Sequence, residues 1–465
     1  MRALAAILMC AATSLAFARG SAVADEVSLE RTGDGLPKCG LGSAFHSGRR
    51  AALRRELGAG VVVVRGLPDT RDYVPFRQDK VFWYLTGVES ANAWLVMDCA
   101  SGREVLLLPD PNKMQEMWEG EQWDAGDAWV KQLTGFAEVL PARDATRVIG
   151  EMLADSKKLW VSLHPSLALS GAADRAKPYD RAREKDPFDG RVGREKAFAA
   201  KLEETFGVKP SDFAPTLNEL RRVKTVEELA AMRRAARSGA LAMIEAMRST
   251  RPGIGEWEID SLMTWFQVKE GAAGPGYMAI VGSGANSLVL HYGANNRRML
   301  EGEVLLVDYA PEVDHSVCDI TRTWPVNGKF SARQAELYDA VLASQKAGIA
   351  VVKPGAKLED VESACRRVLE ERGFGPLIRH GACHYIGMEV HDVGNAGKPL
   401  SVGACFTIEP GLYEPDSSIG IRIEDVVVVT ETGCDVISAL VPKERAEIEA
   451  LIASEGVLDW LAVQR

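Results

Sequence analysis

The sequence predicts a two-domain α/β protein, and three features of the chain lead to this expectation. Its 465 residues are long enough for two substantial domains, and an apolar fraction of 46% with 26% charged residues is typical of globular proteins. Helix-like and strand-like segments alternate from about residue 45 to residue 153. A second region starts near Leu217 with two helical patterns and continues with short apolar strands and further helices.

The first region is expected to be an N-terminal α/β domain over residues 25–215. Residues 49–57 have helical character, and the run of four valines at 61–64 is typical of a buried strand. Residues 172–200 are charged, contain glycine and proline, and have few large apolar groups, so we interpret them as an exposed insertion or linker. The strand candidates of this domain are 60–66, 81–85, 93–97 and 105–108.

The second domain is expected over residues 216–465. Apolar residues recur at helical spacing in residues 226–248, and this pattern ends before Pro252 and Gly253. The other predicted helices are 256–269, 332–352 and 358–372, and the predicted strands are 278–281, 304–307, 316–321, 404–408 and 423–429.

The start of the chain resembles a secretory signal. Arg2 precedes an apolar run over residues 3–17, and Ala22-Val23-Ala24 is a small-x-small cleavage site. The run is shorter than the ~20 residues that cross a bilayer, and no later stretch is long and apolar enough to span one. We therefore predict a signal peptide over residues 1–24 and a mature protein that is periplasmic or secreted, with no membrane attachment.

The charge and the cysteines exclude some classes of protein. The formal net charge is −10, and removal of Arg2 and Arg19 would make the mature chain more acidic, which argues against nucleic acid or an anionic membrane as a partner. Seven cysteines would remain after removal of Cys10, at irregular spacing, so a disulfide framework is not expected, although one bridge would fit.

Acidic residues at the ends of apolar strands point to a metal site. Asp308 ends the run VLLVD, Glu409 ends CFTIE, and Glu424 lies in GIRIED. A buried carboxylate needs a salt bridge or a metal to offset the cost of desolvation. Asp319 adds a fourth carboxylate, and only Arg322 and Arg422 lie nearby in sequence, so a pair of dications would balance the excess negative charge.

Histidines gather in the same half of the chain. Of seven in total, His380, His384 and His391 fall within HGACHYIGMEVHD, and His291 lies upstream. Four carboxylates with an imidazole form an oxygen-rich ligand field that suits Mn(II), Co(II), Fe(II) or Zn(II) better than copper. With five ligands for two ions, at least two carboxylates must bridge, which holds such ions ~3.5–4 Å apart and allows them to acidify water and polarise a carbonyl.

Five motifs follow one another in this region: SLVLHYG, DYAP with DITRTWPVNGKF, HGACHYIGMEVHD, TIEPGLY and GIRIED. Together they resemble the aminopeptidase P and prolidase family, the pita-bread metallopeptidases. The upstream segment VPFRQDKVFWYLTGVE resembles the N-terminal domain of creatinase and prolidase type that accompanies that catalytic domain. The resemblance covers roughly residues 45–445, and it implies a C-terminal pita-bread domain with a curved antiparallel sheet covered by helices.

The resemblance also implies roles for individual residues. Asp319 and Glu424 would bridge the two ions, and Glu409 would accept a proton from water. His291 and His391 would hydrogen-bond the substrate and stabilise the tetrahedral intermediate. The implied metal ligands are Asp308, Asp319, His384, Glu409 and Glu424, and the residues that would orient them are His380, Tyr413 and Arg422.

The function implied first is an Xaa-Pro aminopeptidase, which releases the N-terminal residue when proline follows. It would use two divalent ions, manganese first among them, and assemble as a homo-dimer or homo-tetramer. A dipeptidase of the prolidase kind shares every ligand, so it is the first alternative. A creatine amidinohydrolase does without the ligands, and a peptide-binding module on the same fold would be expected to have lost them, whereas all five are present.

Some positions depart from the family pattern or admit a simpler interpretation. Tyr309 and Pro311 follow the first aspartate where a small residue and glycine are usual, and we favour a repacked strand end over a narrowed substrate pocket. The short stretch between Glu409 and Glu424 would give a more open rim. Core packing is expected for Trp83, Tyr84, Trp118, Met243, Met247, Met263 and Trp265.

Overall fold

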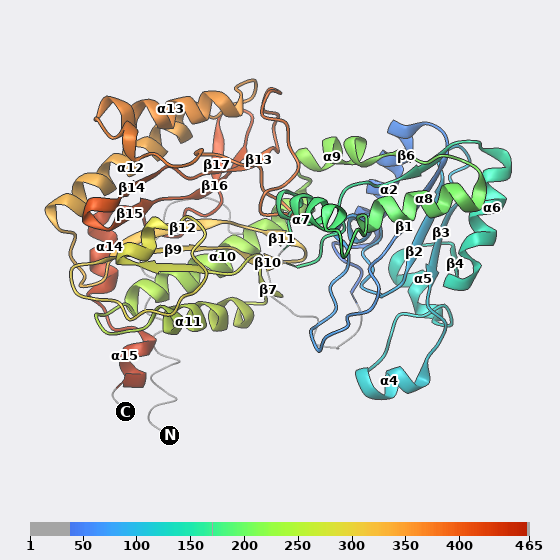
Figure 1. The fold of residues 1–465 in the computed structure, drawn as a ribbon, viewed down its shortest axis with the longest axis horizontal. Coiled ribbons are helices and arrows are strands. Elements are labelled where there is room, and N and C mark those ends of the chain that lie inside the picture. Colours follow the sequence, from blue (N-terminus) through green and yellow to red (C-terminus); the bar gives the residue numbers. More distant parts are fainter. Residues whose placement is uncertain (1–37, 170, 463–465) are drawn as a thin grey trace. The chain divides into compact units, whose positions relative to one another are not determined.

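The computed structural model describes residues 38–169 and 171–462, and the predicted signal peptide, residues 1–24, lies outside the described residues. The described residues belong to a single compact unit, within which two regions have their own sheets (Figure 1). None of the described helices has both the length and the apolar character that crossing a membrane requires.

The N-terminal region is built on one mixed sheet of six strands in the order β4-β3-β2-β1-β5-β6. β2 pairs antiparallel with β1 and β3, whereas the remaining neighbours are parallel. The strands are β1 (Val61–Arg65), β2 (Trp94–Asp98), β3 (Glu104–Leu108), β4 (Glu138–Pro141), β5 (Leu159–Val161) and β6 (Ser211–Asp212).

Both faces of this sheet are buried, which explains the unbroken valine run. Successive side chains of a strand point to opposite faces. Val61 and Val63 pack with helices α6 (Ala145–Asp155) and α8 (Arg194–Phe206). Val62 and Val64 pack on the other face. The helices there are α2 (Ser43–Leu57), α3 (Lys80–Thr86), α5 (Ala128–Thr134) and α9 (Ala214–Arg222).

The strand predicted at 81–85 is wrong, because these residues form helix α3. Asp79 caps the helix by accepting a hydrogen bond from the backbone N–H of Phe82, and Gly87 ends it in the left-handed conformation with φ 71°. All residues of α3 are buried. The segment therefore lacks the periodic spacing of apolar and polar residues that distinguishes a helix from a strand.

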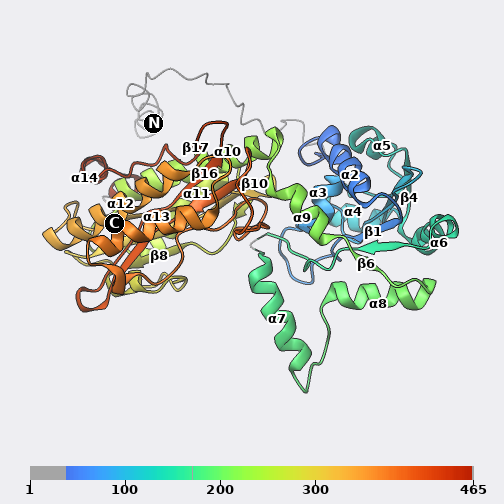
Figure 2. The same ribbon diagram turned by 90° about the horizontal axis from the view of Figure 1, so that it is seen from above.

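The charged segment 172–200 is a helical hairpin rather than a linker. α7 (Ala173–Lys185) runs outward and α8 returns toward the sheet, as Figure 2 shows. Phe188 lies between the two helices and is 99% exposed, in agreement with the predicted exposure. Leu202 of α8 belongs to the core beneath the sheet.

Helices cover the strands of the C-terminal region on two sides. Figure 1 shows α10 (Val226–Arg248) and α11 (Glu256–Lys269) on one side of the strands and α12 (Ala332–Val351) and α13 (Leu358–Glu371) on the other. The strands form small antiparallel sheets in the orders β12-β9-β8, β13-β16-β17, β14-β15 and β11-β10-β7.

The remaining elements have the following bounds. The strands are β7 (Gly274–Pro275), β8 (Ile280–Ser283), β9 (Val304–Tyr309), β10 (Pro311–Val313), β11 (Ser316–Val317), β12 (Ile320–Pro325), β13 (Cys405–Ile408), β14 (Gly411–Glu414), β15 (Ile419–Arg422), β16 (Asp425–Val429) and β17 (Cys434–Val436). The helices are α4 (Lys113–Glu119), α14 (Arg445–Ile452) and α15 (Val457–Ala462).

Two of the predicted strands are interrupted where candidate ligands lie. The segment 316–321 divides into β11 and β12, and Asp319 falls in the break. The segment 423–429 begins later than predicted, because Glu424 falls between β15 and β16. At these breaks the backbone leaves the ladder, which frees the carboxylate-bearing residues to face a common point.

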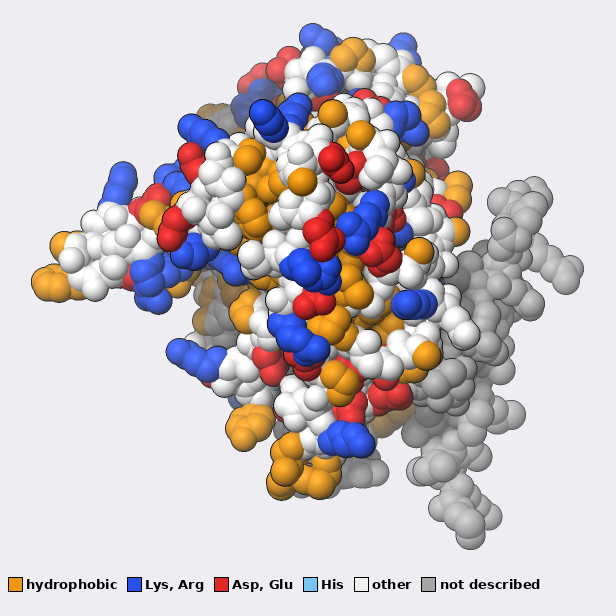
Figure 3. Space-filling view, turned by 90° about the vertical axis from the view of Figure 1, so that its right-hand side faces the viewer, with side chains coloured by type: hydrophobic (Ala, Val, Ile, Leu, Met, Phe, Trp, Pro, Cys, Tyr) orange, Lys and Arg blue, Asp and Glu red, His pale blue; other side chains and the backbone are white. Residues whose placement is uncertain are grey.

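Most of the expected core residues are buried, but two tryptophans are not. Trp83, Tyr84 and the three methionines are fully or almost fully covered. Trp118 is 78% exposed and Trp265 is 55% exposed, so the core prediction for these two is wrong. Figure 3 shows that hydrophobic side chains also gather among charged ones on the outward face of the N-terminal region.

The expectations for Tyr309 and for the cysteines also concern buried side chains. Tyr309 is fully buried and its hydroxyl donates to the carbonyl oxygen of Met263 at 3.2 Å. This contact agrees with the repacking interpretation. The cysteines at positions 39, 99, 318, 365, 383, 405 and 434 are all free, so the described residues contain no disulfide bond.

Candidate metal centre

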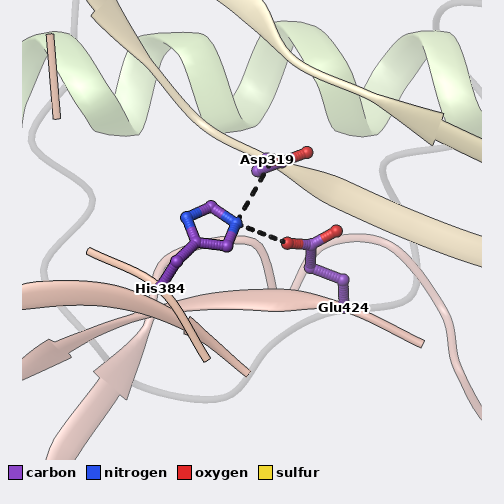
Figure 4. Close-up of side chains that lie close together, drawn as sticks. All are labelled: Asp319, His384 and Glu424. Carbon is purple, nitrogen blue, oxygen red and sulfur yellow. Dashed lines mark ion pairs between the residues drawn. The ribbon is translucent and has the colours of Figure 1, made fainter. Parts of the chain in front are cut away.

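The imidazole of His384 lies at the centre of a group of carboxylates. Its Nε2 is 3.4 Å from Glu409 Oε1, 3.8 Å from Glu424 Oε1 and 3.9 Å from Asp319 Oδ2. Figure 4 shows His384 between Asp319 and Glu424, and one ligand atom from each of these three residues lies within 4.8 Å of the others. Three separate segments of the C-terminal region thus converge on one point.

Asp308 joins the group through a tyrosine. The hydroxyl of Tyr277 donates to Asp308 and also contacts Asp319 Oδ1 at 2.6 Å. Arg422 Nη2 donates to the other oxygen of Asp308 at 2.6 Å. The structure therefore brings all five predicted ligands together, and their roles as metal ligands remain a prediction.

Backbone hydrogen bonds between segments hold the carboxylates in place. Thr407 N donates to His384 O at 2.8 Å, and Glu409 N donates to Ala382 O at 2.8 Å. Glu424 N donates to Thr321 O at 3.0 Å, and the Thr321 hydroxyl donates to Glu424 Oε2 at 2.7 Å. These bonds tie the residues that carry the candidate ligands, which lie just outside the strands, to neighbouring segments.

The pKa shifts show that the protein compensates only one of the four carboxylates. Burial raises the pKa of Asp319, Glu409 and Glu424 well above the ordinary values, and neighbouring carboxylates raise them further. Burial also acts to raise the pKa of Asp308, but Arg422 and Tyr277 hold it below its ordinary value. Among the described residues, no lysine or arginine lies within ion-pair distance of the other three.

These residues fit a divalent cation. Glu424 Oε1 is buried and has no hydrogen-bond partner within the described part of the chain. His384 Nδ1 lies 3.1 Å from Tyr385 O, to which it donates when protonated, and this leaves Nε2 unprotonated. Burial lowers the pKa of His384 to about 4, so the ring stays neutral near pH 7, as a metal ligand must.

A chain of hydrogen bonds connects the predicted orienting residues. His380 Nε2 lies 2.7 Å from the Tyr413 hydroxyl, and Arg422 Nη1 donates to the same hydroxyl at 2.8 Å. Arg422 then contacts Asp308 through its other terminal nitrogen. The chain thus ends at the candidate ligand Asp308, and His380 Nδ1 lies 3.8 Å from Oε2 of a second one, Glu409.

The two histidines predicted to contact substrate lie at the edge of the site. The ring of His391 packs edge-on against that of His384, with centroids 4.4 Å apart. His291 follows Leu290, whose carbonyl oxygen accepts from Arg422 Nη2 at 3.5 Å. Burial lowers the pKa of His291; Asp308 opposes this shift, whereas the nearby Arg422 and His391 add to it.

A second buried cluster of charges lies close by. Its two acids are on the loop that carries His384, a few residues after it. Glu389 Oε1 is 2.8 Å from His164 Nε2 and 2.9 Å from Arg221 Nη2. Asp392 pairs with Arg221 and, at 2.8 Å, with Lys224 Nζ. Burial acts to raise the pKa of both acids, but the paired groups hold both values below the ordinary range.

Sequence reasoning did not identify Tyr277 or Thr321 as parts of the site. Tyr277 bridges two ligands that lie 31 and 42 positions away, and Thr321 reaches Glu424 across 103 positions. Neither residue belongs to a pattern of acids or histidines, so composition and spacing give no signal for them.

Comparisons with known proteins match both regions. Residues 46–160 match the model of the aminopeptidase P N-terminal domain, and residues 230–431 match metallopeptidase family M24. The Xaa-Pro aminopeptidase of Haemophilus influenzae is 32% identical over 81% of this chain and 89% of its own, and that of Escherichia coli is 30% identical over 82% and 90%.

Solved structures agree with these matches. Aminopeptidase PepP of Pseudomonas aeruginosa superimposes with a TM-score of 0.75 at 28% identity, covering 88% of this chain and 98% of that one. A zinc-substituted aminopeptidase P of Escherichia coli in complex with product gives 0.76 at 29% identity, with the same coverage. The predicted fold, a pita-bread domain preceded by a smaller α/β domain, is confirmed.

Proposed function

The chain belongs to the aminopeptidase P family of metallopeptidases, and on this premise we propose that it is an exported Xaa-Pro aminopeptidase that uses two divalent ions. The name shared by its relatives supports the substrate class. The single observation that carries the metal requirement is the group of buried carboxylates around His384, three of which have no lysine or arginine partner among the described residues.

The proposed ligands are the five residues Asp308, Asp319, His384, Glu409 and Glu424. Two ions are proposed because four carboxylates and an imidazole offer more donor atoms and more negative charge than one dication needs. When bound, the ions would supply Lewis-acid activation of water and of the scissile carbonyl. Manganese is proposed first, with cobalt, zinc and iron as alternatives.

The side chains around the ions would divide the remaining work. Glu409 would accept the proton of the attacking water, because its carboxylate is the most exposed of the uncompensated three, at 17%, and burial raises its pKa. Arg422 and Tyr277 would hold Asp308 in one orientation. His291 and His391, at the edge of the site, would contact the substrate and the developing oxyanion.

A peptide panel tests the substrate class and the prolidase alternative together. We expect hydrolysis of Xaa-Pro-Xaa tripeptides and longer Xaa-Pro peptides with release of the first residue, and no cleavage of matched peptides with alanine in the second position. Cleavage confined to Xaa-Pro dipeptides would favour the prolidase. Failure to cleave any Xaa-Pro peptide after metal loading would favour a binding module.

Metal dependence is tested by chelation followed by addition of manganese, cobalt, zinc or iron. We expect chelation to abolish hydrolysis, manganese to restore the highest rate, and elemental analysis to give two ions per chain. A ligand that binds the folded state at 100 times its Kd adds about 2.7 kcal/mol to stability, so re-addition should also raise the thermal midpoint. A chain that retains full activity without bound metal would contradict the proposal.

We also propose that the protein is exported and that it assembles as a homo-oligomer. The proposal of export rests on Arg2, the apolar run and the Ala22-Val23-Ala24 site. N-terminal sequencing of the mature protein should start at Asp25, and fractionation should find it outside the cytoplasm. The proposed domains are 25–215 and 216–465, and sedimentation should show a homo-dimer or homo-tetramer.

A further inference from the structure

The helical hairpin of the N-terminal region begins directly against the loop that carries His391. The backbone N–H of Ala173, the first residue of α7, donates to Glu389 Oε2 at 2.9 Å, and Glu389 is fully buried. Lys80 Nζ donates to Gly171 O at 3.1 Å and to Met388 O at 2.6 Å. The start of α7 is therefore tied to this loop through two buried charged side chains.

This attachment delivers a carboxylate to His391. Asp174 follows Ala173, and its Oδ2 lies 2.6 Å from Nδ1 of His391 across 217 positions of sequence. No charged side chain other than Asp174 forms an ion pair with His391 among the described residues. The other side of the ring contacts His384, so His391 is held between the metal centre and the hairpin.

A carboxylate at Nδ1 has two consequences for an imidazole. It accepts a hydrogen bond from Nδ1–H, which fixes the tautomer and the plane of the ring, and it stabilises the ring when the second nitrogen also carries a proton. In either state Nε2 is the nitrogen that remains free for substrate. We propose that Asp174 is a positioning residue that sets the orientation of His391, so that the N-terminal domain completes the active site; this rests on the proposed peptidase function.

The alternative is a surface ion pair without catalytic consequence. Asp174 and His391 are 47% and 38% exposed, and pairs of this kind contribute about 0–1 kcal/mol to stability. The anchoring of Ala173 by buried Glu389 argues for a defined geometry, since the backbone next to Asp174 cannot move freely. The two possibilities differ in one respect. Only a positioning role makes the loss of Asp174 lower kcat by way of His391.

A double-mutant cycle on the metal-loaded, full-length mature protein separates them. The variants are Asp174→Ala, Asp174→Glu, His391→Ala and the double variant Asp174→Ala/His391→Ala, assayed on an Xaa-Pro peptide that the parent cleaves. Misplacement of a group by ~1 Å can cost about 100-fold in rate, so we expect Asp174→Ala to lower kcat by roughly 10- to 100-fold with a small change in KM. Asp174→Glu should recover part of the loss.

The cycle also identifies the route of the effect. In the His391→Ala background, removal of Asp174 should have no further effect on kcat. Metal content and the thermal midpoint of Asp174→Ala should equal those of the parent. Glu184→Ala is the matched control, because it removes another carboxylate of α7 that pairs with Lys196 of the same hairpin, and its kcat should be unchanged.

Three results would overturn the inference. They are a kcat of Asp174→Ala within twofold of the parent, an equal loss of kcat in the parent and His391→Ala backgrounds, and an equal loss in Glu184→Ala. A parent that cleaves no Xaa-Pro peptide would instead refute the proposed function, so the two failures are distinguishable.

Discussion

Two buried groups of acids border the loop over residues 384–392, and they differ in what balances their charge. Around His384, the carboxylates Asp319, Glu409 and Glu424 have pKa values raised by burial and by one another. A few residues further on, Glu389 and Asp392 are as deeply buried, yet paired groups hold their pKa values low.

In the second group, both acids are paired with basic side chains. Arg221, Lys224 and His164 face its two acids at hydrogen-bond distance, and removal of one partner of such a buried pair typically destabilises a protein by several kcal/mol. The first group lacks equivalent cations. Burial of carboxylates is therefore not in itself a sign of a metal site, whereas burial without compensation from the protein is.

The comparison predicts opposite responses to neutralising one acid, and Asp319→Asn should give the largest effect. The loss of one charged donor, which we propose bridges the two ions, should lower kcat at least about 1,000-fold, since metal ions contribute several kcal/mol to the transition state. In the metal-free protein, the same change relieves repulsion with Glu424 and Asp308. The thermal midpoint without metal should therefore equal or exceed that of the parent.

The measurements are peptide hydrolysis, metal content and calorimetry with and without chelator. Asp435→Asn is the control, because Asp435 is an exposed acid that pairs with Arg233 at the surface. Near-normal turnover of Asp319→Asn, or a metal-free protein that melts clearly below the parent, would show that the first group is not an uncompensated metal site.

In the second group, Glu389→Gln should reduce stability instead. The change removes the charge that faces Arg221 and His164, so we expect a loss of about 3 kcal/mol in the free energy of unfolding with unchanged metal content. Urea denaturation of the metal-loaded protein measures it. Glu219→Gln, which alters an exposed pair with Lys398, should change stability by less than about 1 kcal/mol. Equal losses in both variants would contradict the distinction.

Much of the fold could be predicted because local signals were strong. Helix α10 was placed at both ends, since its apolar residues recur at helical spacing over residues 226–248 and this pattern stops before Pro252. The segment 81–85 was assigned to the wrong element because its helix is buried on all sides. Trp118 and Trp265 show the opposite error, since residue type alone does not reveal which helix face is exposed.

The residues of the candidate site also differ in whether the sequence alone identifies them. The four acids were found because buried charge in apolar sequence is costly. His384 stood out in a cluster of histidines, and the resemblance to the family implied its role. Tyr277 and Asp174 act on residues 31 and 217 positions away, and only the folded chain brings them there. The compensating partners of Glu389 were also invisible, because Arg221 and His164 lie in the N-terminal half of the chain.

The smallest effect is expected at Tyr309. This residue is next to a candidate ligand in sequence but belongs to neither group of acids. Its ring is buried in the core and its hydroxyl donates to Met263 O. Tyr309→Phe should lose one neutral hydrogen bond, worth about 1 kcal/mol of stability, with kcat, KM and metal content unchanged. A change of more than about threefold in KM across first residues of different size would mean that Tyr309 shapes the substrate pocket, and adjacency to Asp308 would then matter for chemistry as well as for packing.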